Sequence, residues 1–182
     1  MILRYVFNFI TFAFLINCAG NNDKNNELSD QIQFSPPEKQ YTEAMLKFDN
    51  QQYDLAAEQF KYIERIYPLS NEAIQSQIMQ GFIKYILLDY DSAIIHFSKI
   101  INKYPSLKNI DYVYYMKAIC FYEQISHEGL DGTFNDLALE NLNQVIQRFP
   151  NSKYAKDSIQ KKILVKSNIA AKHMTIARFY QK

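Results

Sequence analysis

The chain has 182 residues, of which 48% are hydrophobic, so it is long and apolar enough for one domain with a continuous core. Its 20 basic and 19 acidic residues leave a formal net charge of +1, which excludes the basic field of a typical nucleic-acid-binding protein. With four glycines in the whole chain, neither a phosphate-binding P-loop nor a dinucleotide-binding glycine motif is present.

The N-terminus has the pattern of an export signal. Arg4 supplies a positive charge, and residues 5–16 form an apolar run that is too short to span a bilayer as a helix. The run ends in Leu15-Ile16-Asn17-Cys18, which resembles a bacterial lipobox. This resemblance implies that Cys18 is diacylated, becomes the first residue of the mature protein and anchors it in a membrane. The alternative is an ordinary secretory signal with an incidental cysteine.

These patterns divide the chain into three segments. We expect a lipoprotein signal peptide at residues 1–17, a lipidated flexible tether at 18–35 and a repeat domain at 36–182. Residues 19–35 lack hydrophobic periodicity, as a tether would. Ser35-Pro36-Pro37-Glu38 then joins a capping serine to first-turn prolines and a glutamate, which predicts the start of a helix.

A short signature returns at a fixed distance along the chain. Residues 53–60 end in an aromatic and are followed by Tyr67-Pro68, and residues 90–97 repeat this pattern 37 positions later, before Tyr104-Pro105. A third copy, shifted by 45, ends in Phe149-Pro150. Repeats of this length, each built of two helices and a turn that contains proline, are typical of helical solenoids. The sequence therefore predicts an all-α fold whose surface carries the function.

The repeat register places the helices. Each Tyr-Pro or Phe-Pro step ends the second helix of a pair, because the residue before proline avoids the α region. A further series of small residues, Ala44, Gly81 and Ala118, also recurs every 37 positions, and we expect the paired helix to approach closely there. The predicted helices are 37–49, 53–66, 71–88, 91–103, 110–125, 134–148 and 153–181, that is, three pairs and a long final helix.

The third repeat is eight residues longer than the others, and the extra residues fall within 126–133, which hold two glycines and no apolar period. Insertions in solenoids lie in loops on one face, and such loops often make contacts. A surface excursion without a role is the equal alternative.

The repeats resemble tetratricopeptide repeats, and together with the lipobox they resemble the BamD family, outer-membrane lipoproteins of the β-barrel assembly machinery. The matching segments are Tyr53-Asp54-x-Ala56-x-x-x-Phe60, Tyr67-Pro68-x-Ser70, Asp89-Tyr90, Asn109-x-Asp111-Tyr112-x-Tyr114-Tyr115-Met116 and Phe149-Pro150-Asn151-Ser152-x-Tyr154-Ala155-x-Asp157. Family members continue past the segment that matches residues 176–180, so we expect either a C-terminally truncated chain or a short version. In a truncated chain the last helix would expose Ile163, Leu164, Ile169, Ile176 and Phe179.

The resemblance implies a non-enzymatic assembly factor, lipid-anchored on the periplasmic face of the cell outer membrane. Its implied partners are unfolded outer-membrane protein clients, a BamA-like barrel protein that bears POTRA domains, and other lipoproteins of the assembly complex. Nucleic acid is not an implied partner. A generic periplasmic repeat scaffold, serving envelope division or peptidoglycan coordination, is the alternative.

Positions that line the concave face in tetratricopeptide repeats hold mostly aromatic residues here. Phe48, Tyr85 and Tyr122 share one repeat position, while Tyr41, Ile78 and Tyr115 share another. With Tyr112, these residues are the candidates for a groove that binds extended peptides by apolar contact and hydroxyl hydrogen bonds. The equally weighted alternative is that the rings only pack one repeat against the next.

The sequence offers no catalytic or metal-binding constellation, and no cofactor is expected. His96, His127 and His173 are too far apart in sequence for a helical metal pair, and no C-x-x-C or H-E-x-x-H motif occurs. His96 lies where a second helix of a pair packs, so we expect a half-buried histidine with a hydrogen-bond partner rather than a ligand.

Overall fold

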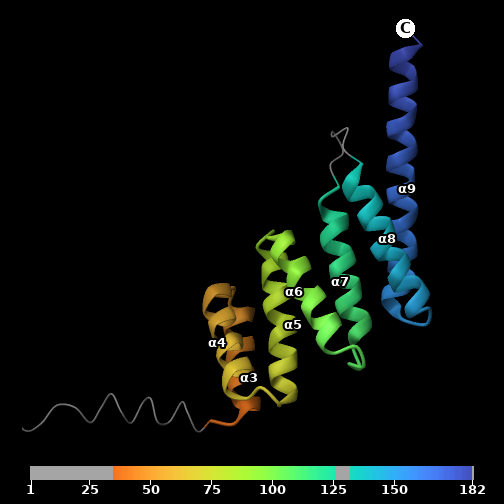
Figure 1. Cartoon of the computed structure of the whole chain (residues 1–182). Helices are drawn as coiled ribbons and strands as arrows, with labels where there is room; N and C mark the ends of the chain where they lie inside the picture. Colours follow the sequence, from red (N-terminus) through yellow and green to blue (C-terminus); the bar gives the residue numbers. More distant parts are fainter. Residues whose placement is uncertain (1–34, 126–131, 182) are drawn as a thin grey trace, which may run out of the picture. The chain divides into compact units, whose positions relative to one another are not determined.

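The computed structural model describes residues 35–125 and 132–181. The predicted signal peptide at 1–17, the predicted tether at 18–35 up to residue 34, with Cys18, and residues 126–131 of the inserted segment lie outside these ranges. The unit from Pro37 to Lys182 contains every helix described below. It is all-α and built from helix pairs, as the repeat register predicts (Figure 1).

Consecutive helices lie side by side and antiparallel in chain order, so that each packs mainly on its neighbours in sequence (Figure 1). The helices are α3 (Pro37–Asp49), α4 (Tyr53–Ile66), α5 (Asn71–Ile86), α6 (Tyr90–Lys103), α7 (Ile110–Glu123), α8 (Thr133–Arg148) and α9 (Lys153–Tyr180). Among the described helices, none combines the length and the apolar character that a membrane span requires.

The second helix of every pair ends in the same turn. The N–H of Tyr67 donates to Ile63, and the N–H of Ser70 donates back to Tyr67. Tyr104 and Leu107 repeat this arrangement after α6, and Phe149 and Ser152 repeat it after α8. The recurring aromatic–proline step therefore specifies a fixed turn that starts the next pair.

The first helices of the first two pairs end with a residue in the left-handed region. Gln51 has a φ of 60° and Leu88, 37 positions later, a φ of 62°. In both turns this residue donates to the carbonyl three residues back, and the next residue donates to the carbonyl five residues back. This is the Schellman arrangement, which usually uses glycine. It ends α5 at Ile86, so the prediction of a helix to residue 88 is wrong by two residues.

The small residues that recur every 37 positions lie where the two helices of a pair meet. Ala44 and Ala118 are fully buried, and Gly81 is buried against α6. A Cβ added at Gly81 would lie 2.7 Å from Cε1 of Phe97, whose side chain is itself fully buried. The expected close approach of paired helices is therefore present, and its tightest point is between Gly81 and Phe97.

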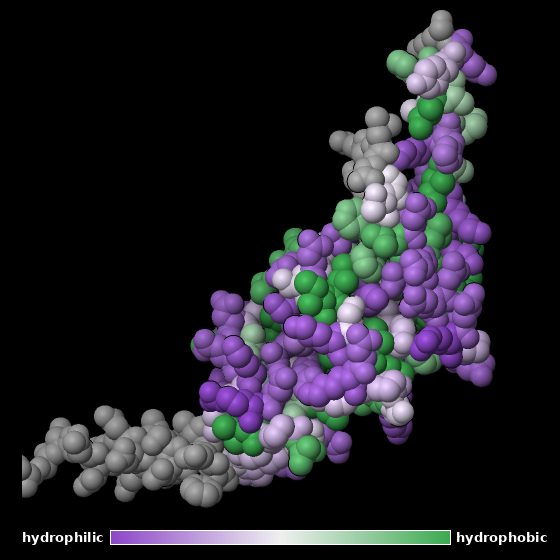
Figure 2. Space-filling view, viewed as in Figure 1, coloured by the Kyte–Doolittle hydropathy of each residue, from purple (hydrophilic) through white to green (hydrophobic). Residues whose placement is uncertain are grey.

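The long final helix is buried along its first half only. Ala155, Ser158 and Val165 are buried against α7 and α8, and Ile169 packs on the same cluster. The other apolar residues that we expected to be exposed on α9 are exposed, with Phe179 at 75%. In Figure 2, hydrophobic residues appear among hydrophilic ones along the part of α9 that extends past α8. The expectation that Ile169 is exposed is wrong, because its side chain is half-buried against the core residues of α8.

We predict that Gly81→Ala lowers the free energy of unfolding by about 1–3 kcal/mol, because the added methyl overlaps the buried Phe97 ring. This loss exceeds the gain of about 1 kcal/mol in helix propensity. Urea unfolding followed by circular dichroism measures it. Adding Phe97→Leu should recover part of the loss, so the two changes should not be additive. A rise in the urea midpoint for Gly81→Ala would contradict the tight approach.

We predict that Leu88→Gly raises the free energy of unfolding by about 0.5–1 kcal/mol, because glycine adopts a positive φ without the Cβ clash. Leu88 is 68% exposed, so little packing is lost. The matched control is Leu87→Gly, at a φ of −79° and also exposed, which should destabilise the protein. Thermal unfolding distinguishes the two, and equal shifts for both variants would refute the strain argument.

Candidate functional site

The aromatic residues predicted to line a groove are also the residues that join one repeat to the next. The ring of Phe48 lies 5.9 Å from Phe82, which stacks on Tyr85 at 6.0 Å, and Tyr85 lies 5.8 Å from Tyr90. This row runs from α3 across α5 to α6. Phe48 and Tyr85 are half-buried, so each ring packs between repeats on one side and remains accessible on another.

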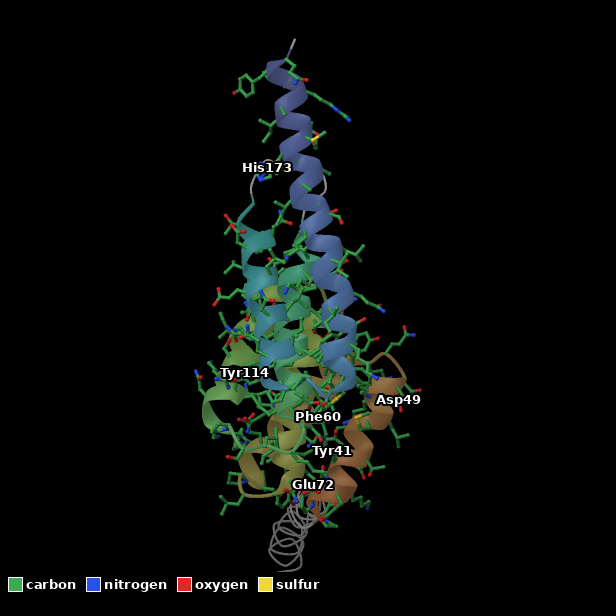
Figure 3. All side chains as sticks on the ribbon, turned by 90° about the vertical axis from the view of Figure 1, so that its right-hand side faces the viewer. Tyr41, Asp49, Phe60, Glu72, Tyr114 and His173 are labelled. Carbon is green, nitrogen blue, oxygen red and sulfur yellow. The ribbon has the colours of Figure 1, made fainter. Side chains whose placement is uncertain are left out.

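The residues at the second predicted repeat position, Tyr41, Ile78 and Tyr115, differ in burial and in partners. Tyr41 is half-buried beside the fully buried Phe60, with ring centroids 5.5 Å apart (Figure 3). Ile78 is 5% exposed and belongs to the core. Tyr115 is half-buried, and its hydroxyl donates to Oδ2 of Asp157 at 2.7 Å. Tyr122, at the first position, packs on the α8–α9 core with Nζ of Lys161 5.2 Å from its ring centroid.

The start of α7 meets the start of α9, two segments that lie about one repeat apart in sequence. The hydroxyl of Ser152 donates to Oδ2 of Asp111 at 2.6 Å. The Tyr154 ring lies 5.4 Å from Tyr112 and stacks on Tyr115 at 4.9 Å. These contacts bring together two of the segments quoted for the family resemblance, Asn109–Met116 and Phe149–Asp157. Their residues therefore form one structural unit.

Beside this unit a pocket of about 450 Å³ opens between α5, α7 and α9. Its apolar lining comes from Ile78, Met79, Tyr112 and Tyr154, and polar side chains surround it. The polar residues are Gln75, Asn109, Asp111, Ser152 and Lys153. An apolar concavity with a few convergent polar groups is the usual form of a binding site.

Of the predicted groove residues, Ile78 and Tyr112 line the pocket, whereas Tyr41, Phe48, Tyr85, Tyr115 and Tyr122 do not. Sequence reasoning missed Gln75, Met79 and Tyr154. Tyr154 could have been found, because its segment and that of Tyr112 were the two most detailed family motifs. Gln75 and Met79 carry no motif, and only the packing of α5 beside α7 brings them to the pocket.

Tyr112 and Tyr115 stay neutral across the physiological range. Burial raises the pKa of Tyr112 to about 12. Burial, followed by the hydrogen bond to Asp157, raises the pKa of Tyr115 still further. Both hydroxyls therefore act as neutral hydrogen-bonding groups, and Tyr115 donates to a carboxylate as this requires.

Two other reactive side chains, His96 and Cys120, pack in the interior. Nε2 of His96 lies 2.8 Å from the carbonyl oxygen of Gln77, and burial is the main cause that lowers the His96 pKa. The half-buried histidine with a partner is thus confirmed. Burial raises the pKa of the Cys120 thiol to about 12, which leaves it inert. His173 is exposed on α9 (Figure 3). Within residues 35–125 and 132–181, no group of histidine, cysteine or carboxylate side chains could hold a metal ion.

Comparison with known proteins gives a consistent result. A family model described as YfiO, outer membrane lipoprotein, matches residues 34–182. The outer membrane protein assembly factor BamD of Caulobacter vibrioides is 32% identical over 170 residues, which cover 93% of this chain and 55% of that protein. The BamD of Rickettsia prowazekii is 33% identical over 165 residues, which cover 91% of this chain and 63% of that protein. The BamD of Neisseria gonorrhoeae is 25% identical over 177 residues.

The chain thus spans 55% and 63% of the length of the first two of these relatives. The match to the family model, in contrast, includes the whole of the described repeat unit. The resemblance inferred from the repeat motifs is therefore confirmed: the chain belongs to the YfiO family of outer membrane lipoproteins.

Proposed function

We propose that this protein is a non-enzymatic assembly factor for outer-membrane β-barrel proteins. In this role its repeats bind targeting segments of unfolded clients and dock on the barrel assembly complex. The observation that carries the proposal is the match to BamD proteins along more than nine-tenths of the chain. The descriptions of these relatives as assembly factors give no support to the alternative of a scaffold for envelope division.

The proposed anchor is Cys18, diacylated at the end of a signal peptide at 1–17 and followed by a tether to residue 35. The repeat domain would then lie on the periplasmic face of the outer membrane. Support comes from the lipobox pattern and from the lipoprotein character of the family. Lipid chains contribute roughly 0.8 kcal/mol per buried methylene, so two or three chains suffice for lasting attachment.

The proposed client-binding surface consists of the pocket between α5, α7 and α9 and the row of half-buried rings beside it. The pocket's apolar lining suits an aromatic side chain, and the free amides of Gln75 and Asn109 suit the backbone of an extended segment. The neutral hydroxyl of Tyr112 adds a hydrogen-bond donor without placing a charge in the site.

The proposed docking surface for the assembly complex lies on α9. This helix carries seven lysine or arginine side chains and one aspartate, whereas no other described helix has more than one excess basic residue. Exposed apolar side chains such as Ile163 and Met174 lie among these charges. A surface of this kind suits an acidic face of a partner such as a POTRA domain of a BamA-like barrel protein.

We predict that an unfolded barrel protein, diluted from urea, binds the purified chain saturably and that Gln75→Ala with Met79→Ala weakens binding about tenfold. Fluorescence anisotropy of the labelled client measures this. The matched control, Gln147→Ala with Met174→Ala, changes the same residue types on exposed positions outside the pocket and should bind like the unchanged chain. Equal binding of an unfolded water-soluble protein would sink the client proposal.

We predict that affinity purification of the lipidated protein from envelope extracts recovers a POTRA-bearing barrel protein. Lys166→Glu with Arg178→Glu should reduce that recovery severalfold, because both exposed charges lie on α9. The control is Lys61→Glu with Arg65→Glu, the same residue pair exposed on α4. Quantitative mass spectrometry compares the three samples, and equal losses in both charge-reversal variants would argue against docking through α9.

A further inference from the structure

The fixed charge at the pocket between α5, α7 and α9 is negative. Asp111 accepts two hydrogen bonds there, from the backbone N–H of Tyr112 at 2.9 Å and from the Ser152 hydroxyl at 2.6 Å. These bonds hold its carboxylate at the junction of α7 and α9. Within the described residues, no lysine, arginine or histidine forms an ion pair with it. The pocket therefore contains a positioned carboxylate whose charge is not neutralised by the protein.

The positive groups nearby do not offset this charge in a fixed way. Lys153 is exposed, and its Nζ lies 5.0 Å from the centroid of the Tyr154 ring, at the end of a long flexible side chain. The N-terminus of α9 is already capped, because the Ser152 hydroxyl oxygen accepts from the N–H of Tyr154 at 3.2 Å. At α7 the Asp111 carboxylate itself takes up the N–H of Tyr112. A ligand anion would therefore find no fixed positive charge here, and at each helix N-terminus one N–H is already taken up.

The neutral part of the pocket suits an aromatic side chain within an extended segment. Met79, Tyr112 and Tyr154 line the pocket, and thioether and tyrosine side chains are favourable neighbours of an aromatic ring. Gln75 and Asn109 have no side-chain hydrogen bond within the described structure, so both amides are free to pair with peptide groups. The volume of about 450 Å³ lies in the lower part of the roughly 300–1,000 Å³ found for ligand pockets.

The geometry points to a specific ligand: an aromatic side chain in the interior of a client segment, next to a lysine or arginine that pairs with Asp111. The pocket does not read a free carboxyl terminus, because a second carboxylate would face Asp111 across a short distance. This inference rests on the proposed function, since it names which part of a client enters the site. The proposed ligand also differs from that of a carboxylate clamp, in which fixed basic residues hold the carboxylate at the end of a chain.

The test uses labelled peptides of about ten residues and the purified chain, with binding followed by fluorescence anisotropy. One peptide has a central phenylalanine next to lysine, and the second has glutamate in place of the lysine. A third ends in phenylalanine with a free carboxylate, and a fourth is its amide. We expect the lysine peptide to bind about tenfold more tightly than the glutamate peptide. The amide should bind at least as well as the free acid.

Asp111→Asn should abolish the preference for lysine over glutamate while keeping a side chain that can bond to Ser152. The matched control is Asp91→Asn, an exposed aspartate in the first turn of α6 away from the pocket, which should leave the preference unchanged. Circular dichroism reports whether each variant is folded. For the unchanged chain, rising salt should also reduce the preference, which tests the charge pairing without any substitution.

Two results would overturn the inference. One is a tenfold loss of affinity on amidation that Lys153→Ala reproduces, which would identify a carboxylate clamp. The other is an unchanged lysine preference in Asp111→Asn. If unfolded barrel proteins bind but none of the four peptides does, the pocket assignment fails while the assembly proposal stands. If neither binds, the assembly proposal fails as well.

Discussion

The close contact between the two helices of each pair sets the geometry of the whole repeat unit. In each pair a small residue of the first helix lies against a large buried residue of the second: Ala44 is in one cluster with Phe60, Gly81 faces Phe97, and Ala118 is in one cluster with Leu142. Close packing of this kind tolerates little change in volume. The distance between paired helices is thereby fixed, and residues of α5, α7 and α9 meet at one pocket.

The candidate site depends on this arrangement indirectly, through the position of α9. Once α8 is fixed against α7, the turn after α8 delivers the start of α9 to the start of α7. Short polar contacts then join them, from Ser152 to Asp111 and from Tyr115 to Asp157. Hydrogen bonds to carboxylates are charge-assisted and therefore comparatively strong. The two rings that line the pocket, Tyr112 and Tyr154, lie 5.4 Å apart in a tilted arrangement, and Tyr154 also stacks on Tyr115.

Much of the fold could be predicted because the same structural signals recur in each repeat. The aromatic–proline steps end helices by a local steric effect, and the series Ala44, Gly81 and Ala118 reports where helices meet. The end of α5 was misplaced because a leucine at position 88 adopts a conformation that sequence rules reserve for glycine. The site was harder to predict. Helical stripes of aromatic residues serve packing and binding alike, and only the structure separates Tyr112, which lines the pocket, from Tyr85, which does not. Gln75 reaches the site by tertiary packing alone.

The pocket also has a mechanical meaning. Among the described helices α5 approaches α3, α4, α6 and α7 but not α9, so the two outer walls of the pocket are connected only through α7. In a solenoid each repeat contacts only its neighbours, so the interfaces between repeats can act as hinges. A segment seated between α5 and α9 would act as a strut across two of these hinges and fix their angle. Occupancy of the pocket would then be transmitted along the stack as a change in curvature, without any rearrangement within a helix pair.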